Sequence, residues 1–542
     1  MESRRSSASR ARARPTAPAR RQRGLIDWSR NVLGQLLERV LPPRAPARRR
    51  PVVEMLEPRL LLSTSPLPQP SFGATLAYTA PALGGPLDAV LRLVDTGAAN
   101  LDVELRSSGG SLLASRALDQ NLRVAFTGSA FNDTLTVNLN YADLDGNPAF
   151  SPFAIKIEFD GGTDVPGASD DQLRIVASGN HTYITGGLFV TSTDDVVIGG
   201  VLRSSGDIDI QAADAIRVDP GANVQGRDIR LASVVTAQGL PLAGEVGASG
   251  SAEVRIDSAT ITGRQIGIDA GVTATLDSSE VGLFPAHVRL GVVGVDVDAR
   301  VDLLGSTAIT ATAGLAIEAR SKADVKLDAS PDANANRTDT DAALAFSVVG
   351  SSADVRVRGS TSLAATGALT VAAVNEVDVK TVADGGAGSS SGSALGGTVA
   401  FTHVSGGTRV AIEGSAALSG ASVNVTADAT RNVETRSRST QGGATAPAAG
   451  QPKTEGQKKL DENDAKTSEG QLNLAAAVAV TRIEGDSAVA VSTSGTLSAT
   501  HAMLLRARHQ VAGPSGGVAT VADGSTTTGG ATGIGAAAAI HS

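Results

Sequence analysis

The segment Gly206-Asp207-Ile208-Asp209-Ile210 decides the fold, because its pattern of two aliphatic residues separated by one residue returns along the chain. It recurs as Gly186-Gly187-Leu188-Phe189-Val190, Arg227-Asp228-Ile229-Arg230-Leu231 and Arg264-Gln265-Ile266-Gly267-Ile268. The first aliphatic residue falls at 188, 208, 229 and 266, in steps of 20, 21 and 37 residues. Strict alternation predicts a short strand with one buried face. We expect one turn of a repeat about every twenty residues, with the 37-residue step spanning two turns.

A longer unit overlays the short one farther along the chain. Its landmarks are Ile309, Leu363, Leu418 and Leu497, in steps of 54, 55 and 79 residues. Each copy carries aliphatic residues upstream and downstream at matching positions: Val292, Val301, Leu303, Leu315 and Ile317; Phe346, Val355, Val357, Leu369 and Val371; Phe401, Val410, Ile412, Val423 and Val425; Val480, Val489, Val491, Met503 and Leu505. We attribute the excess in the last step to a polar, disordered insertion at about 440–470.

These periods predict an all-β chain folded as a right-handed parallel β-helix over residues 179–542. Stacked equivalent strands form ladders of Val, Ile, Leu and Ala, and backbone hydrogen bonds run between turns. About sixteen turns at about 4.8 Å each would give a rod on the order of 80 Å long. A string of β-sandwich domains is the alternative, and the 20-residue step disfavours it.

Composition excludes several classes of protein. The 542 residues include 10 Phe, 3 Tyr, 1 Trp and no Cys. So few aromatic side chains disfavour an ordinary multi-domain enzyme. The absence of Cys excludes disulfide frameworks, thiolate nucleophiles and Cys-ligated metal sites.

A basic arm precedes an acidic body. Residues 1–59 hold 15 Arg, no Lys and 5 acidic residues, whereas the whole chain has a net charge of −8. We predict a largely disordered arm over 1–70 with one amphipathic helix at about 25–41, ended by Pro42 and Pro43. That helix suits a partner protein or an anionic membrane surface. Nucleic acid is not an expected partner, because the acidic body would repel phosphates. Residues 71–178 are predicted to be an irregular β region and a candidate cap.

Seven residues of the arm resemble a known signature. The run Leu56-Glu57-Pro58-Arg59-Leu60-Leu61-Leu62 is similar to the LEPR-XLL motif of very large bacterial exported or surface proteins, with Leu56, Glu57, Pro58, Arg59, Leu61 and Leu62 at its fixed positions. The resemblance implies targeting by an export machinery. The repeat body resembles filamentous haemagglutinin-like adhesins, which implies an extracellular or outer-membrane-associated location and a carbohydrate or protein as surface ligand.

Calcium is the one candidate cofactor. Asp143 and Asp145 alternate as in calcium loops but lack the distal Glu of an EF-hand. Asp160, Asp164, Asp170 and Asp171 resemble degenerate pieces of calcium-binding nonapeptides, without the tandem copy that completes a site.

No catalytic constellation is evident. His181, His287, His403, His501, His509 and His541 show no metal-ligand spacing. The pair Asp194-Asp195 is interpreted as a turn or solvent-facing pair, and Gly385-Gly386-Ala387-Gly388 lacks the Lys of a phosphate loop.

We therefore expect a non-enzymatic, exported, adhesin-like repeat protein. Residues 536–542 resemble the opening of a new copy, with His541 in the place of His403, so we expect an N-terminal fragment of a longer array. A β-helix polysaccharide lyase or hydrolase and a calcium-dependent matrix protein remain the alternatives.

Overall fold

The computed structural model describes residues 67–541, except 82–84, 98–99, 119, 139–152, 163–170, 185, 243–244, 279–287, 330–339, 386–393, 440–472, 513–518 and 524–532. The predicted helix at 25–41 and the motif at 56–62 lie outside the described residues. Every regular element in the described part is a β-strand. The prediction of an all-β parallel β-helix is confirmed.

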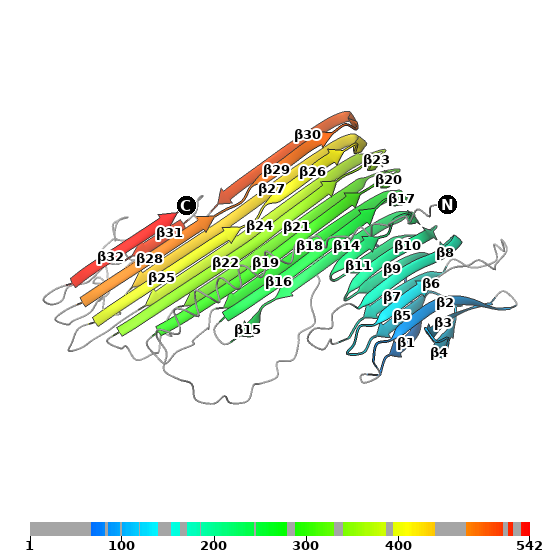
Figure 1. Cartoon of the computed structure of the whole chain (residues 1–542), viewed down its shortest axis with the longest axis horizontal. Coiled ribbons are helices and arrows are strands. Elements are labelled where there is room, and N and C mark those ends of the chain that lie inside the picture. The colour runs from blue at the N-terminus through cyan, green and yellow to red at the C-terminus, as the bar shows by residue number, and fades with distance from the viewer. Residues whose placement is uncertain are drawn as a thin grey trace, which may run out of the picture. The chain divides into compact units, whose positions relative to one another are not determined.

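The coil has three rows of strands (Figure 1). Within a row, each strand pairs in parallel with the equivalent strand on the next turn of the coil, and we call one such turn a rung. The first row contains, in spatial order, β1 (Ala74–Thr79), β5 (Leu122–Thr127), β7 (Ala154–Asp160), β9 (Gly187–Ser192), β11 (Ile208–Ala212), β14 (Asp228–Gln238), β18 (Gln265–Ser278), β21 (Leu315–Ala329), β24 (Ala368–Gly385), β27 (Ala417–Ser439) and β30 (Leu497–Ala512). β31 (Ala519–Asp523) extends the row beside the end of β27.

The second row returns the chain across the coil. It contains β2 (Asp88–Gly97), β6 (Thr134–Asn138), β8 (Gln172–Ile184), β10 (Asp195–Ser204), β12 (Ala215–Val218), β16 (Glu245–Asp257), β19 (Val288–Leu304), β22 (Thr340–Val357), β26 (Thr408–Gly414) and β29 (Ser487–Thr493). β25 (Ala394–Ser405), β28 (Asn473–Ile483) and β32 (Gly533–His541) continue from the first half of β22.

The third row is short and forms one corner. After the end of β10 it holds β13 (Asn223–Gln225), β17 (Thr260–Gly263), β20 (Ala308–Ala311) and β23 (Ser362–Ala365), and then the start of β27. Antiparallel pairs occur at β2–β3 (Asn100–Ser107), β3–β4 (Leu112–Ala117) and β15 (Leu240–Leu242)–β16. The other pairings in the described part are parallel.

The ladders predicted from the sequence are present in register. Ile309 pairs with Leu363, which pairs with Leu418, and Leu418 pairs with Leu497. The predicted columns that run through Val301, Leu315 and Val292 are aligned in the same way. The extra residues of the last long step lie between Ser439 and Asn473, where the preceding rung joins Gly385 to Ala394 by a shorter connection.

The predicted number of turns is wrong. Ile229 pairs directly with Ile266, and Ile266 with Leu315, so the 37-residue step is one rung and not two. The 54-residue steps are likewise single rungs, because Leu315 pairs with Leu369 and Leu369 with Val423. Added residues lengthen the strands instead of adding rungs: β11 has 5 residues and β27 has 23. Alternation of apolar and polar residues could not show the length of a rung, because one long strand and two short strands have the same alternating pattern.

Two other expectations are also changed by the register. Within residues 71–178, β1, β2, β5, β6 and β7 stack in the same parallel rows as the later strands, whereas β3 and β4 pair antiparallel, and the boundary at 178/179 falls inside β8. His541 pairs with Thr481, which is in register with Thr402, so His541 does not occupy the position of His403.

Candidate functional site

An N-terminal strap crosses the outside of the first row. We use this name for residues 67–72. The backbone N–H of Leu67 donates to Asp209 Oδ2 on β11 at 3.2 Å, and the Phe72 ring stands edge-on to Phe189 of β9 with centroids 6.0 Å apart. Outward residues of a β-helix are ordinarily solvated, yet β9 and β11, which the strap contacts, are buried almost throughout.

A buried ion pair lies beneath the strap. Arg230 Nη1 is 3.2 Å from Asp209 Oδ1, and the two side chains are 4% and 1% exposed. Gln211 Nε2 also donates to Asp209 Oδ1, at 3.3 Å. A buried carboxylate is costly unless its oxygens are paired, and the strap N–H, the guanidinium and the amide together supply hydrogen-bond partners to Asp209.

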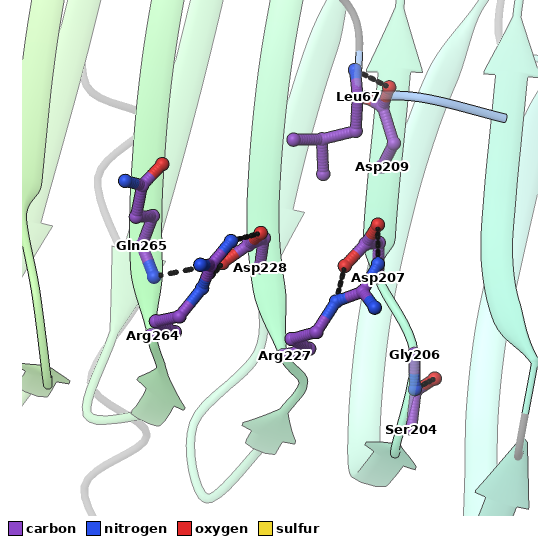
Figure 2. Close-up of polar contacts among 9 residues, drawn as sticks. All are labelled: Leu67, Ser204, Gly206, Asp207, Asp209, Arg227, Asp228, Arg264 and Gln265. Atoms are coloured by element: carbon purple, nitrogen blue, oxygen red, sulfur yellow. Dashed lines mark hydrogen bonds and ion pairs between the residues drawn. The ribbon is translucent and has the colours of Figure 1, made fainter.

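Two bidentate Arg–Asp pairs follow at the starts of the strands (Figure 2). Arg227 donates from Nε and Nη2 to Asp207 at 2.7 and 2.5 Å, and Arg264 donates in the same way to Asp228 at 2.9 and 2.5 Å. Each arginine therefore pairs with the aspartate of the preceding rung. The Arg264 guanidinium lowers the pKa of the Asp228 carboxyl below its usual value. A carboxylate held in this way is a poor proton donor at neutral pH.

A groove of about 340 Å³ lies on the outer face beyond these pairs. Leu67 lies at the strap end of it, and Arg230, Gly267, Asp269, Ala316 and Thr370 are among the other lining residues. Gly267 and Ala316 are neighbours in one column and have little or no side chain, so the surface is hollowed at these two positions. The groove offers small apolar contacts with carboxylate and guanidinium groups beside them.

The second row carries alternating charges on its outer face. Glu253 of β16 is the register neighbour of Arg300 on β19, and Arg300 is the register neighbour of Asp354 on β22. Within β19, Arg300 also lies 2.5 Å from Asp302. Burial raises the pKa of Glu253 and of Asp354 above their usual values. Burial also raises the pKa of Asp214 and of Asp378.

The predicted calcium residues are only partly described. Asp143, Asp145, Asp164 and Asp170 lie outside the described residues. Asp160 Oδ1 accepts a hydrogen bond from Gly162 N at 3.1 Å.

Asp171, the last of the predicted calcium residues, also accepts a hydrogen bond from a backbone N–H group. Asp171 is buried, and its Oδ1 accepts from Asp133 N at 2.5 Å. Within the described part, no group of three or more His, Asp or Glu side chains is placed to hold a metal ion.

The Asp194-Asp195 pair also caps backbone groups of neighbouring rungs. Asp194 Oδ2 accepts from Gly161 N at 3.2 Å, and Asp195 Oδ1 accepts from Ala215 N at 3.1 Å. The two carboxylates thus face different rungs. This arrangement fits the interpretation of the pair as a turn.

The histidines are scattered over the described part. His403 lies on β25, His501 and His509 on β30, and His541 on β32. Burial lowers the pKa of His403 and of His509. His287 lies outside the described residues.

Comparison with protein-family models, with curated proteins and with solved structures finds no match to this chain. In the described part, no helical segment has the length and apolar character of a membrane span. The class of protein is therefore defined by the fold alone: a parallel β-helix solenoid.

The sequence reasoning missed the buried ion pair and the groove. Asp209 and Arg230 each stand between the two aliphatic residues of equivalent segments, so the sequence places opposite charges at the same position of adjacent repeats. That charge complementarity was a usable signal. The covering strap was not predictable in the same way, because it crosses the strands outside the repeat.

Proposed function

We propose that this protein is an exported, surface-associated structural repeat protein that presents its solenoid as an adhesin-like binding surface. The observation that carries the proposal is the outer face of the first row, which the strap contacts at β9 and β11 and which is hollowed at Gly267 and Ala316. The strap shows that this face holds an extended polypeptide through a carboxylate, Asp209, and an aromatic contact at Phe189. The groove next to it offers carboxylates, Asp228 and Asp269, beside small and aliphatic residues.

The chemistry of that face supports binding more than catalysis. Asp207 and Asp228 are each held by a bidentate arginine, and Asp209 is buried beneath the strap. Rigid, paired charges provide a fixed pattern for recognition. Repetition along a solenoid also allows several weak contacts to act together.

Export is the part of the proposal that rests on the LEPR-XLL resemblance. Its test is a tagged full chain in the source bacterium, with surface exposure measured by externally added protease. Arg59→Ala at a fixed position should reduce the exposed fraction at least tenfold, whereas Leu60→Ala at the variable position should leave it unchanged. Equal exposure of both variants and the wild type would remove the motif from the proposal.

A polysaccharide-active enzyme is the second candidate, and one observation favours it. Burial raises the pKa of both Glu253 and Asp354, which lie two rungs apart in one column with Arg300 between them. Inverting glycosidases use two carboxyls about 6.5–9.5 Å apart, one with a raised pKa. Pectin, alginate and other uronides incubated with the purified chain should stay uncleaved under the structural proposal. Cleavage that is lost in both Glu253→Gln and Asp354→Asn would establish the enzyme instead.

The calcium-dependent matrix protein is tested by thermal unfolding. With the described carboxylates Asp160 and Asp171 bound to backbone N–H groups, millimolar calcium or a chelator should leave the midpoint unchanged. A rise of several degrees with calcium would support this alternative.

A further inference from the structure

One inward corner of the coil is closed by a buried arginine. On the preceding rung, Asn375 Nδ2 donates to the backbone carbonyl of Ser351 at 2.6 Å. At the next rung, Arg431 Nη2 donates to the carbonyl of Gly406. Arg431 is 0% exposed and is the largest of the fully buried side chains in the described part. Arg431 is in register with Val377, two residues beyond the column of Asn375, so a charged side chain from the next inward column donates to the equivalent backbone carbonyl.

The charge of Arg431 has no ion-pair partner among the described residues. The carboxylate of Asp486 interacts electrostatically with the Arg431 guanidinium, but the Asp486 side chain is exposed to solvent. His509 also faces Arg431, and both burial and the guanidinium lower the pKa of the His509 ring, which favours its neutral form. Since a guanidinium stays protonated in proteins, its burial requires a compensating negative charge.

Four donor atoms at this corner have no acceptor in the described part. Arg431 contributes Nε and Nη1, and the hydroxyls are Thr408 Oγ1 and Ser487 Oγ. Thr408 follows Gly406 by two residues and pairs in register with Ser487 on the adjoining rung. A Cβ built on Gly485, two residues before Ser487, would lie 2.6 Å from Arg431 Nη2, so both segments converge on the guanidinium.

We propose that this corner binds a small spherical inorganic anion of the halide class, held by Arg431 and by the hydroxyls of Thr408 and Ser487. A halide supplies the missing charge and accepts hydrogen bonds from several directions. Nε and Nη1 lie on different edges of the guanidinium, so one small anion would accept from one of these nitrogens and from the two hydroxyls, whereas a carboxylate or phosphate is gripped by two parallel N–H groups of one edge. The proposal is independent of what the outer face binds.

The test compares chloride with gluconate at constant ionic strength. Thermal unfolding of the full chain should show a midpoint that rises by roughly 2 °C for each tenfold increase in chloride above the dissociation constant. Arg431→Met and Thr408→Val should each remove or reduce this dependence. Arg506→Met is the matched control, because Arg506 is an exposed arginine paired with Asp428 on the neighbouring rung.

Two readouts keep the proposal testable if Arg431→Met does not fold. Chlorine-35 NMR line broadening by the wild type should be displaced by bromide and weakened in Thr408→Val. Crystals grown in bromide should show an anomalous peak beside Arg431. A water molecule at that position, together with chloride-independent unfolding of the wild type, would overturn the proposal.

Discussion

The short rungs and the long rungs of this solenoid fill the interior of the coil with different kinds of side chain. Around β9 and β11 the rungs are 20 and 21 residues long, the inward positions are Leu, Ile and Val, and the strap covers the outer face. Around β22, β24 and β27 the strands reach 18 to 23 residues, and Ala, Ser and Thr become frequent in the interior.

A chain of hydroxyls marks the interior of the long rungs. It passes from Ser347 on β22 to Thr381 on β24, Thr402 on β25, Thr435 on β27 and Thr481 on β28, with oxygen separations of 2.7 to 2.8 Å. The chain alternates between the first and second rows, so the two rows face each other across small side chains. Short rungs are thus held by apolar volume, and long rungs by closely spaced sheets with an internal hydrogen-bond ladder.

The largest expected effect tests the covered face of the short rungs. Asp209→Ala removes the partner of the buried Arg230 and should destabilise the chain by about 3–5 kcal/mol. Local hydrogen exchange at β11 and β14 measures it. Asp228→Ala is the matched control and should cost much less, because its partner Arg264 is 58% exposed. Equal losses would mean that the strap does not bury the Asp209 pair.

The next prediction compares the loss of stability when an inward side chain of one column is shortened on a short rung and on a long rung. Ile210 and Val371 occupy equivalent inward positions on β11 and β24. Ile210→Ala should cost about 3–4 kcal/mol and Val371→Ala about 2 kcal/mol, because the larger side chain leaves the larger cavity. Hydrogen exchange of the adjacent strands is again the measurement. A greater loss at Val371 would contradict the assignment of apolar volume to the short rungs.

The hydroxyl chain is tested at its centre. Thr435→Val removes two hydrogen bonds of 2.7 Å and leaves the Thr481 hydroxyl without its acceptor, which should cost about 1–3 kcal/mol. Thr426→Val on the outward side of the same strand is the control and should be nearly neutral. If Thr435→Val is equally neutral in chemical denaturation, the ladder contributes no stability.

The smallest effect concerns pH. The Arg264 guanidinium lowers the pKa of Asp228 in the folded chain, so this pair stabilises the fold at neutral pH. That stability is lost as the pH falls below about 3.9, the pKa of an unfolded Asp, toward the lower folded value. Arg264→Gln should shift the acid unfolding midpoint upward by about 0.2–0.4 pH unit, since the pair is partly solvated. Arg255→Gln should shift it less, because Arg255 lies 3.9 Å from Asp257.

The sequence was sufficient for the rows and their register, but not for the size of a rung. Columns such as Ile309, Leu363 and Leu418 could be aligned because each inward position repeats its residue type. The rung boundaries were misjudged because alternation continues unbroken through β24, so a long strand resembles several short ones.

The site was less predictable than the fold. The carboxylates at 160 and 171 drew attention as calcium ligands, and the structure shows that Oδ1 of each accepts a hydrogen bond from a backbone N–H, which leaves the calcium prediction untested. The buried Arg431 gave no signal in the sequence, because its corner is assembled from β27 and from the two turns that precede β26 and β29.

The most direct test of the central claim asks whether a 49-residue step is one rung. The chain has no Cys, so Gly267→Cys with Ala316→Cys creates a unique pair on neighbouring strands β18 and β21. Adjacent parallel strands lie about 4.8 Å apart, within the range for a disulfide, whereas two rungs would separate them by about 9.6 Å. Val197→Cys with Arg217→Cys, one 20-residue rung apart, is the positive control. We predict that both pairs form an intramolecular disulfide; a bond in the control alone would contradict the single-rung account.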